Sequence, residues 1–179
     1  HTMTPKTYAL KHYNNTIKIL NGDDSIYTSE WFMDFGKMGS EIFNVDENLL
    51  YKITQKFKFW KWKMEFTIKN SKGDTNYLIS ENNRKTIYGA LLDNINYTIK
   101  IQYKRRTSVY KNDVKIAEFD ASFTDKNHPE TIKLILLDEK DLETVFLLFS
   151  CIKIGETEQS GKALIASQKQ LEINEDPWS

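Results

Sequence analysis

The chain has 179 residues, a length that suits one domain with a sizeable apolar core. Its 25 lysine and arginine residues equal its 25 aspartate and glutamate residues, so the formal net charge is zero and general binding to nucleic acid is disfavoured. The single cysteine, Cys151, excludes an internal disulfide bond and a cysteine-ligated metal site. We expect a cytoplasmic protein, because the sequence has no signal peptide and no segment long enough to span a membrane.

From Met3 to about Leu137 the sequence consists of short β segments separated by turn residues. Asn21-Gly22 is a strong hairpin signal, and Asp93-Asn94 is another separator of this kind. About twelve strands at this spacing are typical of an antiparallel barrel or sandwich. The predicted strands cover residues 6–13, 16–20, 25–32, 38–45, 49–55, 57–69, 75–80, 86–92, 97–103, 107–110, 114–123 and 131–137.

Two of these strands have an informative alternation. In 97–103 the odd-numbered residues are aromatic or apolar and the even-numbered ones are polar, so we expect Tyr103 on the dry face and Gln102 on the wet face. In 57–69 the apolar residues change from odd to even positions near Phe59-Trp60. A shift of one residue turns later side chains to the opposite face, so this change predicts a bulge or turn.

In the segment DLETVFLLFSCIKIG, residues 141–155, the stretch Val145–Ile152 has no charged side chain and no polar face. Asp138 or Asp141 can cap its first turn, and Gly155 can end it in the left-handed conformation. A helix without a polar face is buried all round or inserted in a bilayer, and this one is far shorter than the roughly 20 residues that a bilayer requires. The pattern therefore predicts a buried helix over 141–154, with Cys151 as an inert buried thiol.

A helix with its side chains is about 10–12 Å across, and a barrel of more than eight strands leaves room for an inserted element. We therefore predict a mainly β fold: a closed antiparallel β-barrel of about twelve strands around a buried hydrophobic C-terminal helix. Residues 1–155 are expected to form this single domain. Residues 156–179 are expected to form a tail packed on it, with a short amphipathic helix at about 162–171.

The order of elements resembles that of the tubby C-terminal-like superfamily, which includes the LURP-one-related proteins and the phospholipid scramblases. The resemblance covers about residues 7–155 and includes the FKFWKWKMEF stretch at 57–66 and the terminal DLETVFLLFSCIKI helix. It implies twelve antiparallel strands closed around a hydrophobic C-terminal helix. It also implies, as in tubby domains, binding of phosphoinositides through basic side chains.

The basic residues of the middle of the chain are the candidate binding surface. Residues 50–116 hold 15 basic and 5 acidic side chains, and lysines alternate with aromatic residues in 56–63. Rings beside ammonium groups suit a membrane interface, where rings reach acyl chains and cations meet phosphates. The predicted anionic-lipid ligands are Arg84, Lys85, Lys100, Lys104, Arg105, Arg106, Lys58 and Lys61, with Lys56, Lys63, Lys111 and Lys115 nearby in the sequence.

We thus expect a non-enzymatic binding module, peripheral to an anionic membrane surface or bound to a phosphoinositide, with no cofactor and no metal. The chain has none of the motifs G-x-S-x-G, G-x-x-x-x-G-K-[ST], G-x-G-x-x-G or H-E-x-x-H. Three alternatives stay open: solvated strand faces in a protein-interaction or scaffolding domain without a lipid role, an enzyme with residues scattered over several strands, and a hollow carrier of lipocalin type. Asp46, Glu47 and Asn48 suit a turn better than a calcium site.

Overall fold

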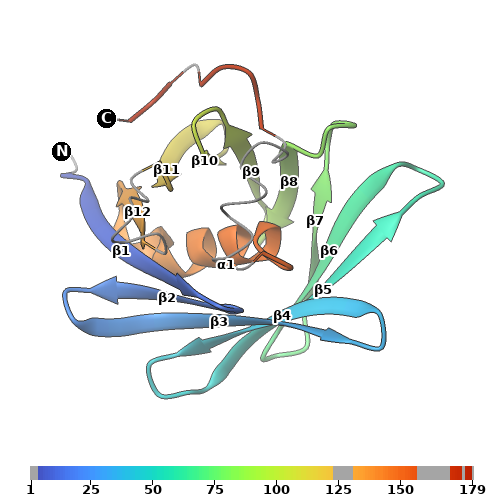
Figure 1. Cartoon of the computed structure of the whole chain (residues 1–179), viewed down its shortest axis with the longest axis horizontal. Coiled ribbons are helices and arrows are strands. Elements are labelled where there is room, and N and C mark those ends of the chain that lie inside the picture. The colour runs from blue at the N-terminus through green and yellow to red at the C-terminus, as the bar shows by residue number, and fades with distance from the viewer. Residues whose placement is uncertain (1–3, 123–130, 157–169, 175, 179) are drawn as a thin grey trace.

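The twelve predicted strands form one closed antiparallel barrel in the computed structural model, which describes residues 4–122, 131–156, 170–174 and 176–178. Each strand pairs with its neighbours in sequence, and β1 pairs with β12 to close the ring (Figure 1). The closed twelve-stranded antiparallel barrel is confirmed. The strands are β1 Lys6–Tyr13, β2 Thr16–Asn21, β3 Asp24–Asp34, β4 Lys37–Asn44, β5 Leu49–Lys58, β6 Lys63–Asn70, β7 Thr75–Ser80, β8 Ile87–Leu92, β9 Ile95–Gln102, β10 Arg106–Lys111, β11 Val114–Asp120 and β12 Thr131–Leu136.

Short turns with left-handed residues join most of these strands. Asp93 and Asn94 have φ of 50° and 63° between β8 and β9, and Asn112 and Asp113 have φ of 48° and 66° between β10 and β11. Two-residue hairpins favour positive φ at both positions because the twist of such a turn matches that of the strands. Asn and Asp tolerate this conformation well, so these sequences end one strand and begin the next.

The aromatic segment is a hairpin, not one strand. β5 ends at Lys58 and β6 begins at Lys63, and the Trp62 amide donates to the Phe59 carbonyl across the turn at 3.2 Å. The predicted turn near Phe59-Trp60 is confirmed, whereas the extent of the predicted strand 57–69 is wrong. The change of phase arises because the apolar residues before and after it lie on two different strands.

The alternation predicted for 97–103 fails at its end. Tyr97 and Ile99 are buried as expected, but Gln102 is only 3% exposed and Tyr103 is 46% exposed. β9 ends at Gln102, and the next three residues form the turn to β10, so Tyr103 no longer follows the strand pattern.

A 3₁₀ turn, Glu139–Asp141, leads into the helix α1, Leu142–Ile152. The Asp138 carboxylate accepts from the Lys140 amide at 3.1 Å, so Asp138 caps the 3₁₀ turn. Asp141 makes no side-chain cap for α1, and its Oδ1 instead lies 3.0 Å from the Lys111 ammonium. Gly155 has the predicted left-handed φ of 89°, but α1 ends earlier, at Ile152 with Lys153 as its C-cap, so the helix is shorter than the predicted 141–154 and Gly155 lies beyond its end.

Side chains of α1 pack against the inward side of the strands, and Figure 1 shows the helix within the ring. The Phe149 ring stacks on the Phe119 ring of β11 at 3.9 Å and 7°, and the Phe146 ring lies 6.1 Å from the Tyr27 ring of β3. Burial also raises the pKa of the Cys151 thiol, which keeps it protonated at neutral pH. The buried residues of α1 are Leu142, Val145, Phe146, Leu147, Leu148, Phe149, Ser150 and Cys151.

The backbone after α1 is tied to two strands through one carbonyl. The Glu156 carbonyl accepts from the Trp31 indole of β3 at 2.8 Å and lies 3.0 Å from Nε2 of His12 on β1. His12 is buried at this position. These bonds hold the end of the helix segment against the barrel wall.

We predict that Phe149→Ala lowers the free energy of unfolding by about 3–5 kcal/mol, because it removes a fully buried ring stacked on Phe119. Urea-induced unfolding measures the loss. Phe35→Ala is the matched control, since Phe35 is fully exposed in the β3–β4 turn and its loss should stay within about 0.5 kcal/mol. Equal effects of the two substitutions would contradict the packing of α1 described above.

Tyr88 provides a prediction about alkaline pH. Its ring lies inside the barrel, 5.9 Å from the Phe66 ring, and burial raises its pKa from 10.0 to about 12. As pH rises, the hydroxyl of Tyr88 loses its proton in the unfolded chain before it does so in the folded protein. The free energy of unfolding therefore falls between pH 10 and pH 12, by about 1.4 kcal/mol per pH unit. Urea unfolding at pH 9, 10 and 11 should show a shallower decline for Tyr88→Phe. Identical pH slopes for the two proteins would contradict this assignment.

Candidate functional site: an aromatic and basic hairpin

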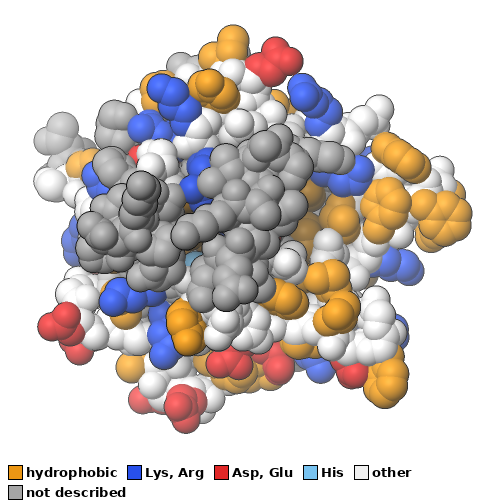
Figure 2. Space-filling model, in the orientation of Figure 1, with side chains coloured by type: hydrophobic (Ala, Val, Ile, Leu, Met, Phe, Trp, Pro, Cys, Tyr) orange, Lys and Arg blue, Asp and Glu red, His pale blue; other side chains and the backbone are white. Residues whose placement is uncertain are grey.

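The tip of the β5–β6 hairpin exposes four aromatic side chains. Phe57, Phe59, Trp60 and Trp62 are 40%, 68%, 61% and 57% exposed. Figure 2 shows hydrophobic side chains gathered at the right edge of the molecule, where this hairpin projects in Figure 1, with basic side chains among them. Large rings are normally buried, so a group of four in water marks a surface that meets something else.

The backbone of the turn fixes how these rings are presented. The Lys61 amide donates to the Lys58 carbonyl at 3.1 Å, and Trp62 takes φ of 55° before β6 begins. The rings then pair edge to face: Phe57 with Trp62 at 5.7 Å and Phe59 with Trp60 at 5.3 Å. Edge-to-face contacts order the rings, and 40–68% of each of these residues stays exposed.

The loop between β7 and β8 brings a cation to the same place. Asn82 organises this loop, because its Oδ1 accepts from the Thr86 amide at 2.9 Å and its Nδ2 donates to the Thr86 hydroxyl at 2.7 Å. The Lys85 ammonium lies 5.0 Å from the Phe57 ring centre and 5.5 Å from that of Trp62. We call this surface the hairpin site; it comprises Phe57, Phe59, Trp60, Lys61, Trp62, Lys63, Arg84 and Lys85.

Two of the predicted ligands near this surface already have acidic partners. The Lys58 ammonium lies 2.6 Å from the Glu65 carboxylate, and neither side chain is fully exposed. Arg84 lies 3.6 Å from Glu172 of the C-terminal segment, by which we mean residues 170–174 and 176–178. Both side chains are well exposed, so this ion pair is weak and easily exchanged. Lys61 and Lys63 are exposed on the hairpin itself. The available charge of the hairpin site therefore comes from Lys61, Lys63, Lys85 and Arg84.

The remaining predicted ligands lie around the turn between β9 and β10. The Lys100 ammonium lies over the Tyr110 ring at 4.9 Å. Lys104 and Arg105 occupy the turn with φ of 61° and 60°, and the Arg105 amide donates to the Gln170 side chain at 3.4 Å. Residues of this turn thus contact the C-terminal segment as well as solvent.

Arg106 does not lie on the wet face that the sequence predicts. Its guanidinium is mostly buried and lies 3.5 Å from Glu118 and 3.4 Å from Asp120, two fully buried carboxylates of β11. Lys115 is buried too and donates to Glu118 at 2.8 Å. Charges neutralised in this way contribute little to attraction of an external anion, so the single basic face predicted for residues 84–115 is divided.

The C-terminal segment covers these ion pairs. Glu118 accepts from the Trp178 amide at 3.0 Å and from the Asn174 side chain at 3.2 Å. The Lys115 ammonium donates to the Asp176 carbonyl and lies 4.9 Å from the Trp178 ring. No sequence pattern indicated these contacts, because Glu118 and Trp178 are 60 residues apart. The helix predicted at 162–171 lies almost wholly outside the described residues.

Within the described ranges, no group of three histidine, cysteine, aspartate or glutamate side chains is arranged to hold a metal ion. No helix in those ranges has the length and apolar character needed to cross a bilayer.

Comparisons with models of protein families, with curated proteins and with solved structures found no match for the chain. The hairpin site presents exposed rings and cations on a projecting turn.

The buried cluster generates a test of how the C-terminal segment is held. Glu118→Ala should lower the free energy of unfolding by about 3–5 kcal/mol, since it leaves Lys115 and Arg106 buried with one acceptor fewer. It should also speed hydrogen exchange at the Trp178 amide, which donates to Glu118. Glu30→Ala, at an exposed position of β3, serves as the control and should leave both quantities almost unchanged. Unchanged exchange at Trp178 in Glu118→Ala would show that Glu118 does not hold the segment.

Proposed function

We propose that this protein is a non-enzymatic binding module that docks on the surface of a membrane containing anionic phospholipid, with the hairpin site as its contact surface. The observation that carries the proposal is the exposure of four rings beside Lys61, Lys63 and Lys85. Aromatic rings prefer the headgroup level of a bilayer, and nearby ammonium groups meet the phosphates there. A peripheral location at a cytoplasmic membrane surface follows from this proposal.

The attraction between the basic side chains and an anionic membrane is too weak by itself for useful binding. Four basic side chains near an anionic surface contribute about 4 kcal/mol, which corresponds to a Kd of about 1 mM. Insertion of the two most exposed rings of the hairpin site, Phe59 and Trp60, adds about 2 kcal/mol each. The resulting total of about 8 kcal/mol corresponds to a Kd of about 1 μM, in the range where peripheral binding is useful. The aromatic residues are therefore as important to the proposal as the lysines.

We also infer that the chain is a tubby-like domain of the kind to which its sequence is similar, with α1 as the hydrophobic element that the barrel encloses. Support comes from the closed ring of twelve antiparallel strands and from the burial of the apolar residues of α1. Phosphoinositide binding by tubby domains makes a phosphorylated inositol headgroup one of the lipids to be tested. The rival function is protein interaction without any lipid role.

Sedimentation with vesicles tests the proposal. The wild-type protein should pellet with phosphatidylcholine vesicles that contain phosphatidylserine or a phosphoinositide, and much less with phosphatidylcholine alone. Two double variants separate the contributions: Phe59→Ala with Trp60→Ala removes rings, and Lys61→Glu with Lys63→Glu reverses charge. Each should weaken binding at least about tenfold, because each removes well over 1.4 kcal/mol.

A matched control lies at the other end of the strands. Val45→Ala with Lys72→Glu changes one exposed apolar residue and one exposed lysine in the β4–β5 and β6–β7 turns. This variant should pellet like the wild-type protein. If the wild-type protein pellets with none of the vesicles, or if the hairpin variants pellet as well as the control, the lipid proposal fails and the protein-interaction function is favoured.

A further inference from the structure

The barrel is closed, but the ladder between β7 and β8 is short. These strands have six residues each, yet they pair at three positions only, between Leu78–Ser80 and Tyr88–Ala90. Thr75 and Tyr77 are paired with β6 on one side, and Leu91 is paired with β9 on one side. No other neighbouring pair among the described strands has so short a ladder. The start of β7 and the end of β8 are thus edges inside a closed barrel.

The direction of the backbone groups follows from the neighbouring hydrogen bonds. The Glu81 amide donates to the Ile87 carbonyl at 2.7 Å, which makes this a hydrogen-bonded pair. Such pairs recur at every second residue of an antiparallel ladder, so the amide and carbonyl groups of Ile79, Tyr77 and Thr75 point toward β8. By the same alternation those of Leu91 point toward β7. The ladder ends before Tyr77 and Leu91, so the backbone groups of both residues face the opening.

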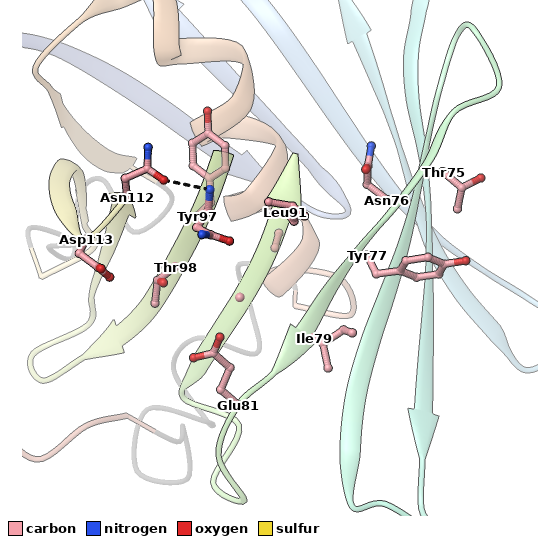
Figure 3. A pocket seen from close by; sticks show the side chains of 13 residues that line it. Thr75, Asn76, Tyr77, Ile79, Glu81, Leu91, Tyr97, Thr98, Asn112 and Asp113 are labelled. Atoms are coloured by element: carbon pink, nitrogen blue, oxygen red, sulfur yellow. Dashed lines mark hydrogen bonds between the residues drawn. The ribbon is translucent and has the colours of Figure 1, made fainter. Parts of the chain in front are cut away.

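A groove of about 760 Å³ occupies this opening. In Figure 3 the two strands meet near Glu81 and diverge toward Asn76 and Leu91. Ile79 and Leu91 supply apolar surface at its walls, and Thr98 belongs to the neighbouring strand β9. The groove therefore combines unpaired strand edges with a lining of small, polar and apolar side chains, which suits an extended chain.

The charged side chains that line the groove have the same sign. Glu81 and Asp113 are its charged lining residues, and both are acidic. Glu81 lies directly over the backbone of Gly89, since a β-carbon there would come within 2.1 Å of its carboxylate oxygen. Glycine at this position therefore leaves space for the carboxylate against the strand. An occupant that carries a lysine or arginine complements this charge.

We propose that the groove binds an extended peptide segment of a partner protein, which pairs with the free edge of β7 and directs a basic side chain toward Glu81 and Asp113. Main-chain hydrogen bonds to Thr75 and Tyr77 provide the affinity, and the two carboxylates provide the preference for a basic residue. A small ligand would not use the free backbone groups of the edge. This site is separate from the hairpin site, and it stands whether or not the protein binds lipid.

Short synthetic peptides test this proposal by nuclear magnetic resonance titration of the full chain. The first probe is an eight-residue blocked peptide that alternates threonine and valine around one central lysine. The second carries glutamate in place of that lysine, and the third is the lysine peptide with alternate backbone nitrogens methylated. The lysine peptide should shift the amide signals of Thr75, Tyr77 and Leu91, and the other two probes should bind at least about tenfold more weakly.

Protein variants locate the basic-residue preference. Glu81→Gln with Asp113→Asn should weaken the lysine peptide about tenfold, because each partly exposed ion pair contributes up to about 1 kcal/mol. Asp23→Asn with Asp34→Asn removes two exposed carboxylates outside the groove and should leave the affinity unchanged.

Three results would overturn the proposal: no shifts at the groove, equal binding of the glutamate peptide, or equal binding of the methylated peptide. Vesicle binding by the Glu81→Gln, Asp113→Asn variant should equal that of the wild-type protein. Whether or not the peptide binds, the lipid proposal is therefore decided separately, by the vesicle sedimentation experiment.

Discussion

The apolar side chains of α1 and those on the inward side of the barrel depend on each other for burial. A barrel of twelve strands is too wide to be filled by its own side chains, and an apolar helix of eleven residues is unstable in water. The stacking of Phe149 on Phe119, which belong to a helix and a strand far apart in the sequence, is the closest ring contact within this core. The packing of α1 supports the strands, and the strands in turn position the hairpin site and the groove between β7 and β8.

Local patterns predicted the parts of the structure that local chemistry determines. Asp93-Asn94 separates two strands and Gly155 adopts the left-handed backbone, as the sequence indicated, and the change of phase after Phe59 marks a real turn. The hairpin rings and Lys61 lie within seven consecutive residues of one hairpin, 57–63, so their proximity was readable from the sequence. The approach of Lys85 to Phe57 was not, because it depends on the pairing of strands from three consecutive hairpins.

Arg106 illustrates why the rest was not predictable. Alternation along a strand tells which side a residue faces, but it does not tell what covers that side. The cover over Lys115 and Glu118 is supplied by residues near the end of the chain, and the partner carboxylates lie on β11. The same limit applies to Gln102, which alternation placed in water and which is buried. Basic residues counted along a sequence thus overestimate the positive charge that a surface presents.

The order of the strands has a consequence for biosynthesis. Eleven of the twelve ladders join strands that follow one another, whereas the last joins Lys6 to Leu136, and α1 comes later still. A nascent chain can form its hairpins one by one as it leaves the ribosome, but the ring cannot close until β12 has emerged. During that interval the inward apolar residues have no helix to pack against. Ring closure and packing of α1 therefore come after hairpin formation, once β12 and α1 have both been made, and the inward apolar surface is exposed to aggregation until then.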